Sequence, residues 1–279
     1  MRRIGLGVLW VLFVSIFTAP LVQAAEFQQS SLVSISQRVQ DDVYAVGRRI
    51  VVSEGVSGTL WFLGGEVNLR GTSKIQRLNG MGGSITLSQP VTGDVHLVSP
   101  SVTIQNSVDG DVVAIAGSFK LAKEAEVKGD VIVASRTAII NGDIQGQLNI
   151  RSRQLNFNGT ADSMLASSSN LNLNGNITND ARLSSTNPIQ LGENARFSGK
   201  VRYWSPSGKQ QNLEDRETSV EFAPEIQEEL TRWDKLWQSG WQWLTWVWSS
   251  FTMILLLFIA TPLFERVGHL LRPEHWEEH

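Results

Sequence analysis

The chain has 279 residues, a formal net charge of −3 and no cysteine. The absence of cysteine excludes disulfide bonds, thiolate catalysis and cysteine-ligated metal. No stripe of Lys and Arg with interleaved aromatic residues occurs, which excludes a nucleic-acid-binding surface.

The N-terminus has the layout of a secretory signal peptide. Two arginines precede an apolar stretch at residues 4–19, and the small residues Ala24 and Ala25 follow it. The apolar stretch is shorter than the roughly 20 residues of a membrane-spanning helix, which favours cleavage near Ala24 over an uncleaved anchor. We therefore expect residues 1–25 to be a signal peptide and the segment after them to lie outside the cytoplasm.

A short phrase, a polar corner followed by two apolar-x-apolar strands, recurs between residues 42 and 200. Its corner positions are 15 to 20 residues apart: Asp42, Thr59, Arg77, Asp94, Asp111, Asp130, Gln147, Asp162, Asp180 and Lys200. Apolar residues stand one and three residues after the corner, eight and ten after it, and three before it. Such alternation directs one face of a strand inward, and self-similarity at a fixed period indicates a solenoid.

Three apolar runs per winding predict an all-β, three-sided parallel β-helix over residues 26–204, with about nine to ten windings stacked on a continuous core. Val33 and Ile35 fit one partial winding further upstream. A glycine precedes most corner positions, which predicts a tight corner with positive φ. These glycines are Gly58, Gly93, Gly110, Gly129, Gly146 and Gly199.

The predicted strands hold few groups that could carry chemistry. His96 stands at an outward position, and we expect it to be structural or neutral. Asp94, Asp111 and Asp130 would stack on successive windings, but each follows glycine at a turn, where Asp is favoured for local backbone hydrogen bonds. Calcium-binding β-rolls need Gly-Gly-x-Gly-x-Asp repeats, which the chain lacks.

Asparagines recur near one bend of the predicted windings and suggest an asparagine ladder, formed by Asn141, Asn158 and Asn174. Such a ladder stabilises the coil and is not a site. We therefore expect no enzyme activity and no catalytic, cofactor-binding or metal-binding residues.

Residues 205–239 read as a polar linker followed by an amphipathic helix from Pro224 to Gln238. Pro224 suits the first position of a helix, and Ile226, Leu230 and Trp233 recur at helical spacing. The apolar stripe has three possible places: the membrane surface, the open end of the rod, or a partner helix.

Residues 240–264 predict one transmembrane helix, because they contain no charge and tryptophans crowd their upstream end. Arg266 and Arg272 follow, which favours a cytoplasmic tail at residues 265–279 and a β-helix on the periplasmic side of the inner membrane. The predicted anchor residues are Trp241, Trp243, Trp246, Trp248, Leu255, Leu256 and Leu257.

The corner phrase Val-x-Gly-Asp-Val, at residues 91–95, 108–112 and 127–131, resembles the bactofilins, the polymer-forming cytoskeletal β-helix proteins of bacteria. The resemblance covers about residues 36–204. It implies a right-handed three-sided β-helix that joins end to end into nucleotide-free filaments. Typical bactofilins are cytoplasmic with short tails, so the chain looks closer to the exported, membrane-anchored members of the family.

The predicted function is a non-enzymatic, membrane-tethered scaffold that self-associates in the cell envelope. The partners expected are a second copy of the chain, the lipid membrane and either cell-wall glycan or an envelope protein. Candidate self-association residues lie at the two rod ends: Val33, Ile35 and Val39 at the first, and Phe197, Val201 and Tyr203 as the last inward set.

Two alternatives stay open. One is a monomeric rod on a membrane anchor that binds glycan or protein. The other is a polysaccharide-active β-helix enzyme, which windings of 15 to 20 residues disfavour because they leave no room for long catalytic loops.

Overall fold

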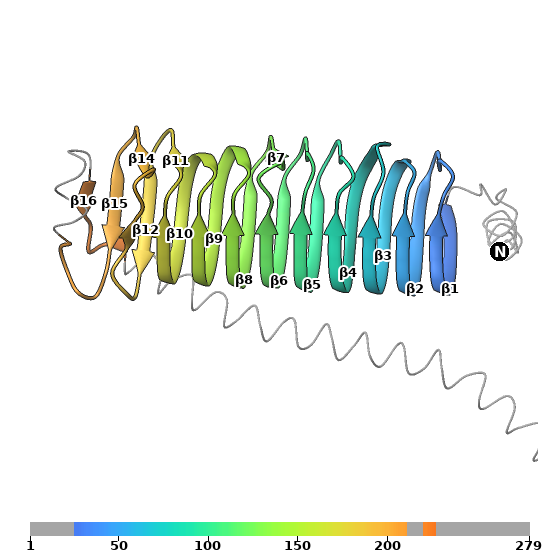
Figure 1. Cartoon of the computed structure of the whole chain (residues 1–279), viewed down its shortest axis with the longest axis horizontal. Helices are drawn as coiled ribbons and strands as arrows, with labels where there is room; N and C mark the ends of the chain where they lie inside the picture. Colours follow the sequence, from blue (N-terminus) through green and yellow to red (C-terminus); the bar gives the residue numbers. More distant parts are fainter. Residues whose placement is uncertain (1–24, 211–219, 227–279) are drawn as a thin grey trace, which may run out of the picture. The chain divides into compact units, whose positions relative to one another are not determined.

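The computed structural model describes residues 25–210 and 220–226. In this part the chain is an all-β parallel solenoid of about 11 turns (Figure 1). The chain divides into two compact units, Met1–Ala223 and Pro224–His279, and every described strand belongs to the first.

Each winding contributes one main strand to the sheet, and each main strand pairs in parallel with the main strand of the next winding. These strands are β1 (Ala25–Ile35), β2 (Asp42–Val52), β3 (Val56–Leu69), β4 (Ile75–Leu87), β5 (Val95–Ile104), β6 (Val112–Leu121), β8 (Val131–Ile140), β9 (Asp143–Phe157), β10 (Thr160–Leu173), β12 (Ala181–Ser185), β15 (Val201–Trp204) and β16 (Val220–Phe222). Four two-residue strands pair beside them: β7 (Glu126–Val127), β11 (Asn176–Ile177), β13 (Gln190–Leu191) and β14 (Arg196–Phe197).

The three predicted inward positions of each winding are confirmed. In β2 and β3, Val43 pairs with Leu60 and Ile50 with Val67. A third ladder runs through the apolar residues before the corners: Val39, Val56, Ile75, Val91, Val108, Val127, Ile144, Ala161, Ile177 and Phe197. Almost all these side chains are buried, and they form one continuous core along the coil.

One predicted corner position is wrong by a single residue. Gln147 pairs with Ser163, not with Asp162, and the register shifts between Ala161 and Ser163. Ala161 occupies the buried position that Ile144 holds in the preceding winding. Ala161 lies two residues before Ser163, whereas Ile144 lies three residues before Gln147, so this corner is one residue shorter. The inward set that follows, starting at Met164, keeps the phase of the coil.

The predicted positive φ at the corner glycines is wrong. Among the described glycines, only Gly71 and Gly208 have positive φ. Close stacking requires the corner glycines instead: a Cβ on Gly58 would lie 2.5 Å from Asp42 Oδ1, and one on Gly146 would lie 2.5 Å from Asp130 Oδ1. A side chain at these positions would therefore collide with the corner of the preceding winding.

The solenoid is longer than the nine to ten windings expected from the sequence. β1 is a full strand, paired from Ala25 with Asp42 to Ile35 with Val52. The sequence pattern did not reveal the first half of β1, because polar Glu26 and Gln28 occupy the positions that apolar Val43 and Ala45 hold in β2. β16, which follows residues outside the repeat, adds a strand at the other end.

Several predictions concern residues outside the described part. They are the signal peptide before Ala25, the amphipathic helix beyond Ile226, the transmembrane helix at 240–264 and the tail at 265–279. Within residues 25–210 and 220–226, no helix has both the length and the apolar character needed to span a membrane.

Candidate functional site

The corner aspartates link successive windings through hydrogen bonds to backbone N–H groups. Oδ1 of Asp94 accepts a hydrogen bond from the backbone N–H of Asp111 at 3.0 Å, and Oδ1 of Asp111 accepts one from Asp130 at 2.8 Å. Asp130 does the same for the N–H of Gln147 at 2.8 Å. The predicted local backbone hydrogen bonds are therefore wrong for these three residues: their Oδ1 atoms accept from the next winding, 17 to 19 residues further along the chain. In the described part, no group of three His, Asp or Glu residues is placed to hold a metal ion.

His96 is exposed on the outside of β5, as predicted. Its Nδ1 lies 2.8 Å from Oδ1 of Asn79, the equivalent residue of the preceding winding. Because an amide oxygen can only accept, this contact fits the tautomer with a proton on Nδ1. The ring therefore takes part in a contact between windings.

The predicted asparagine ladder is only partly formed. Asn158 donates to Oδ1 of Asn141 at 2.8 Å. Oδ1 of Asn174 instead accepts from the backbone N–H of Asn194 at 3.1 Å. Two other amide pairs, which the sequence interpretation missed, join Asn172 to Asn156 and Asn187 to Asn170.

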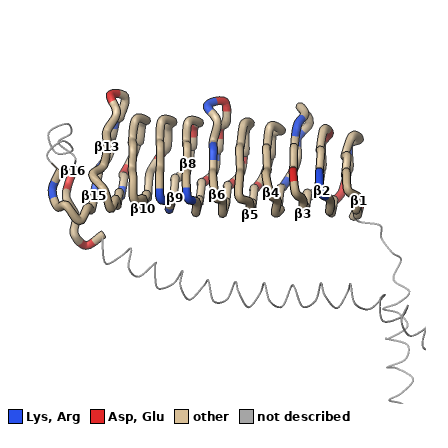
Figure 2. The backbone as a smooth tube through the Cα atoms, turned by 60° about the horizontal axis from the view of Figure 1, so that its bottom comes forward, with Lys and Arg blue, Asp and Glu red and all other residues tan. Residues whose placement is uncertain are grey.

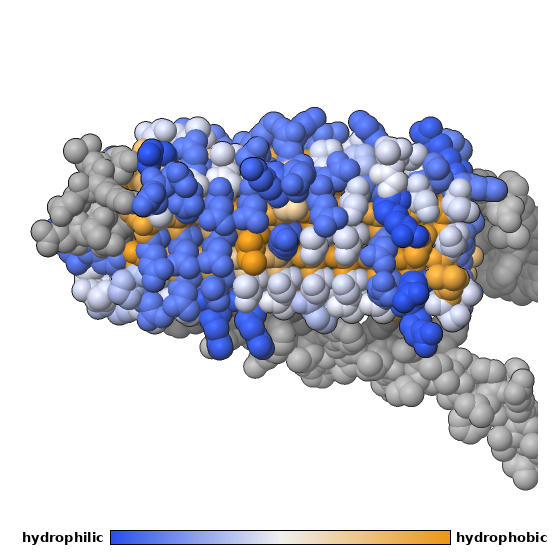
Figure 3. Space-filling model, viewed as in Figure 1, coloured by the Kyte–Doolittle hydropathy of each residue, from blue (hydrophilic) through white to orange (hydrophobic). Residues whose placement is uncertain are grey.

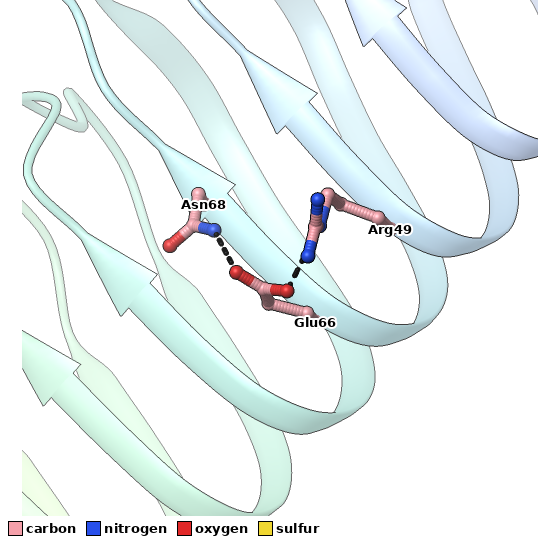
Figure 4. A network of polar contacts seen from close by, with 3 residues as sticks. All are labelled: Arg49, Glu66 and Asn68. Carbon is pink, nitrogen blue, oxygen red and sulfur yellow. Dashed lines mark hydrogen bonds and ion pairs between the residues drawn. The ribbon is translucent and has the colours of Figure 1, made fainter.

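Charged pairs also link neighbouring windings on the surface. Nε of Arg49 donates to Glu66 at 2.9 Å, and Asn68 donates to the other carboxylate oxygen (Figure 4). The hydrogen bond from Asn68, followed by that from Arg49 and its charge, lowers the pKa of Glu66. These side chains are exposed, so the network is a surface contact without features of a catalytic carboxylate.

The N-terminal end of the solenoid offers an open strand edge. β1 pairs with β2 and with no other described strand. Val33 and Ile35 are buried in this first winding, and Val39 is half-buried where it bridges to Val56. An unpaired strand edge is a template for pairing with another strand.

The C-terminal end differs, because the chain covers part of it. Val201 and Tyr203 lie in β15 between β12 and β16, so they are not the last inward set as predicted. The Tyr203 and Phe222 rings meet edge to face at 5.5 Å. Phe197 is buried in β14 and pairs with Ile177 of β11.

The loop after β15 seals this corner of the solenoid. The backbone N–H of Gln210 donates to the Tyr203 hydroxyl at 2.7 Å. Oε1 of Gln210 accepts from the backbone N–H of Ile189 at 3.0 Å. Residues 205–210, expected to be a linker, are therefore partly integrated into the fold, and Ser205 is buried as well.

Large hydrophobic residues are exposed along one side of the coil. We define the outer face as the side chains two and four residues after the corner, from β1 to β8. The first column is Phe27, Tyr44, Trp61, Asn79, His96, Val113 and Ile132, and the second is Gln29, Val46, Leu63, Met81, Val98, Ile115 and Ala134.

The outer face holds seven of the eight exposed large hydrophobic side chains found in the described part, all but Leu32. They range from 40% exposed at Tyr44 to 65% at Phe27, and the Tyr44 and Trp61 rings stack with centroids 6.3 Å apart. In Figure 2 the charged residues gather mainly near the bends of the tube.

The opposite trend appears beyond β8. The same two columns continue with Asn149 and Arg151 in β9, and one of them reaches Arg182 in β12. Figure 3 shows one side of the rod, where hydrophobic residues form a lengthwise band between hydrophilic ones. The sequence interpretation missed the outer face because it followed the inward positions alone; the apolar residues at the alternate positions were the available signal.

An open groove of about 610 Å³ adjoins the outer face at the bend that follows it. Val46 and Leu63 line it together with the glycines of this bend, Gly47, Gly64 and Gly65. Arg48 of β2 and three residues of β1, Gln29, Ser30 and Ser31, complete the lining.

Comparison of the chain with family models, curated proteins and solved structures finds no match.

Proposed function

We propose that the chain is a non-enzymatic, membrane-tethered scaffold of the cell envelope whose rod self-associates end to end. The observation that carries this proposal is the open edge of β1 at one end of a uniform parallel coil. Pairing with a strand edge of a second copy would satisfy the N–H and C=O groups of this edge. The same proposal includes a right-handed, three-sided coil, as the bactofilin resemblance implies.

The tether is proposed from the sequence. Residues 1–25 act as a signal peptide, residues 224–238 form an amphipathic helix and residues 240–264 form a transmembrane helix. This arrangement places the rod in the periplasm and residues 265–279 in the cytoplasm. A reporter that is active only outside the cytoplasm should work when fused after Gln211 and fail when fused after His279. The reverse pattern would refute the proposed topology.

Light scattering and negative-stain microscopy of the full-length chain in detergent test the self-association. We expect elongated oligomers that form without nucleotide and grow with protein concentration. Val33→Asp with Ile35→Asp should reduce them, because both residues belong to the end winding. A strict monomer at every concentration would refute the proposal.

Val33 and Ile35 are buried, so the double variant needs a folding control. In a solenoid, damage to a terminal winding affects mainly its nearest neighbour. Far-UV circular dichroism should therefore retain most of the parental β signal. Loss of oligomers with that signal retained supports end-to-end contact, and unchanged oligomers contradict it.

A further inference from the structure

The outer face is mostly apolar from β1 to β8, apart from the polar side chains of Gln29, Asn79 and His96. Its fourteen residues include no Lys, Arg, Asp or Glu. Single exposed hydrophobic residues are ordinary, but a contiguous patch marks an interaction surface. The pattern ends at β9, where Arg151 enters the column. The outer face is therefore a bounded surface that covers only part of the rod's length.

A mostly acidic column borders one long side of the outer face, and a column with two arginines borders the other. One border is the corner column, which carries Asp42 in β2, Asp94 before β5, Asp111 and Asp130 before β6 and β8, and one basic residue, Arg77 in β4. The other border lies six residues after the corner, at the next bend. It carries Arg48 in β2 and Arg136 in β8, and its remaining residues from β1 to β8 are Ser31, Gly65, Gly83, Pro100 and Gly117.

We propose that this face pairs with the same face of a second copy, the two rods running parallel about a two-fold axis along their length. Such an axis places the corner column of one rod beside the arginine column of the other. Asp42 of one copy then faces Arg48 of the second, and Asp130 faces Arg136, each within the same winding. The interface is isologous, so both ion pairs occur twice.

The apolar columns match under the same symmetry. A side chain two residues after the corner faces the side chain four residues after it in the second copy. Trp61 therefore meets Leu63, and Val113 meets Ile115. If the two rods ran antiparallel with their outer faces fully overlapping, the two-fold axis would pass through β4. Asp42 of one copy would then lie beside Asp111 of the second. Because that arrangement places like charges side by side, it is electrostatically unfavourable.

The size of the face suits a weak but specific dimer. Seven windings spaced about 4.8 Å apart and a width of five residues give roughly 550 Å² on each copy. The two copies together bury about 1,100 Å², near the lower limit of roughly 1,000 Å² for a biological interface. A common membrane tether, which rests on the proposed function, would raise the effective concentration and favour parallel over antiparallel pairing.

Single-cysteine cross-linking tests the pairing in the full-length chain, because the natural sequence has no cysteine. Tyr44→Cys and Ile132→Cys lie near opposite ends of the outer face, and Thr103→Cys lies on another side of β5 as a control. With a short bis-maleimide in intact membranes, we expect dimers from Tyr44→Cys and from Ile132→Cys, and none from Thr103→Cys.

The outcomes separate the possible occupants. Antiparallel pairing can bring only one of the two outer-face positions next to itself, so a dimer at one position alone overturns the parallel arrangement. A water-soluble monofunctional maleimide supplies the second readout. If the cysteines are protected from this reagent but form no dimers, a different partner covers the outer face. If they react freely, nothing covers it. Either result overturns the proposal.

A charge on the outer face at Ile115 of β6, between the windings that hold Tyr44 and Ile132, supplies the matched variant. Ile115→Lys should reduce cross-linking at Tyr44→Cys and Ile132→Cys at least about tenfold, since burying an unpaired ammonium costs more than the roughly 1.4 kcal/mol of a tenfold change. Thr103→Lys should leave it unchanged. If Ile115→Lys rods still form end-to-end filaments, the lateral and end contacts are separate. Intact cross-linking in Ile115→Lys would refute the lateral pairing. Absence of filaments in the parent chain while Tyr44→Cys and Ile132→Cys still cross-link would instead refute the end-to-end proposal alone.

Discussion

Val131→Asp, compared with Ile132→Asp, tests the register of the solenoid at one step of the chain. Val131 is 0% exposed, and its ladder neighbours are Val112 and Leu148. Ile132, the next residue, is 46% exposed on the outer face. The same substitution therefore places a carboxylate inside the core in one variant and in solvent in the other.

The structure sets the size of the difference. Losing the buried valine side chain costs about 2 kcal/mol. Keeping the new carboxyl neutral at pH 7 requires a pKa raised by about three units from its usual value near 3.9, which costs about 4 kcal/mol. The sum of about 6 kcal/mol is comparable to the whole stability of a domain, roughly 5–15 kcal/mol. At protein concentrations at which the chain is monomeric, so that the outer face is open to solvent, Ile132→Asp should change the unfolding free energy by no more than about 0.5 kcal/mol.

Thermal and urea unfolding of the full-length variants, followed by far-UV circular dichroism, measures both effects. The pH dependence gives a second check on Val131→Asp. Its folded-state pKa is raised, so the folded chain binds the proton more tightly and loses stability as pH rises above the unfolded pKa. The defect should therefore be smaller near pH 4 than at pH 7. Equal melting of the two variants, or a larger defect in Ile132→Asp, would refute the assigned register.

Three further predictions concern the polar contacts. Asp130→Ala should lower the unfolding free energy by about 1–2 kcal/mol in urea titrations, because the N–H of Gln147 loses its acceptor; Asp130→Asn keeps an acceptor oxygen and should lose less. Tyr203→Phe should cost about 1–3 kcal/mol by the same measurement, because the backbone N–H of Gln210 then stays buried without a partner, and no loss would contradict the sealing role of this loop. The hydrogen bond from Lys128 lowers the pKa of Asp109, so its contribution is present above the unfolded pKa and lost as pH falls through the folded pKa. A small stability difference between the parent and Lys128→Met at pH 7 should therefore vanish in acid, and a difference that persists would contradict the pairing.

The sequence by itself determined the fold class and most of the register. Strand alternation puts every second side chain on the same side, so a repeat of apolar pairs reports the buried side directly. Val112, Val131 and Leu148 were assigned to one inward ladder from spacing alone, and the structure pairs them. A structural role for the corner aspartates as acceptors of backbone N–H groups also followed from the sequence, but the sequence indicated bonds within the turn and not bonds to the next winding.

Tertiary structure alone decided what happens between windings and at the rod ends. The reason for the corner glycines is the approach of the preceding winding: Gly146 lies against Asp130, a contact that local conformation does not reveal. The one-residue slip before Ser163 and the covering of Tyr203 by β16 also involve residues far apart in the chain.

The outer face shows the same division. Its residues are visible in the sequence as apolar side chains at alternate positions, but a strand buried on both sides has the same pattern. Exposure separates the two cases, and exposure depends on what else packs against the sheet. Stacking also assembles Tyr44, Trp61 and Ile132 into one surface with acidic and basic borders, because only the register between windings determines which side chains become neighbours.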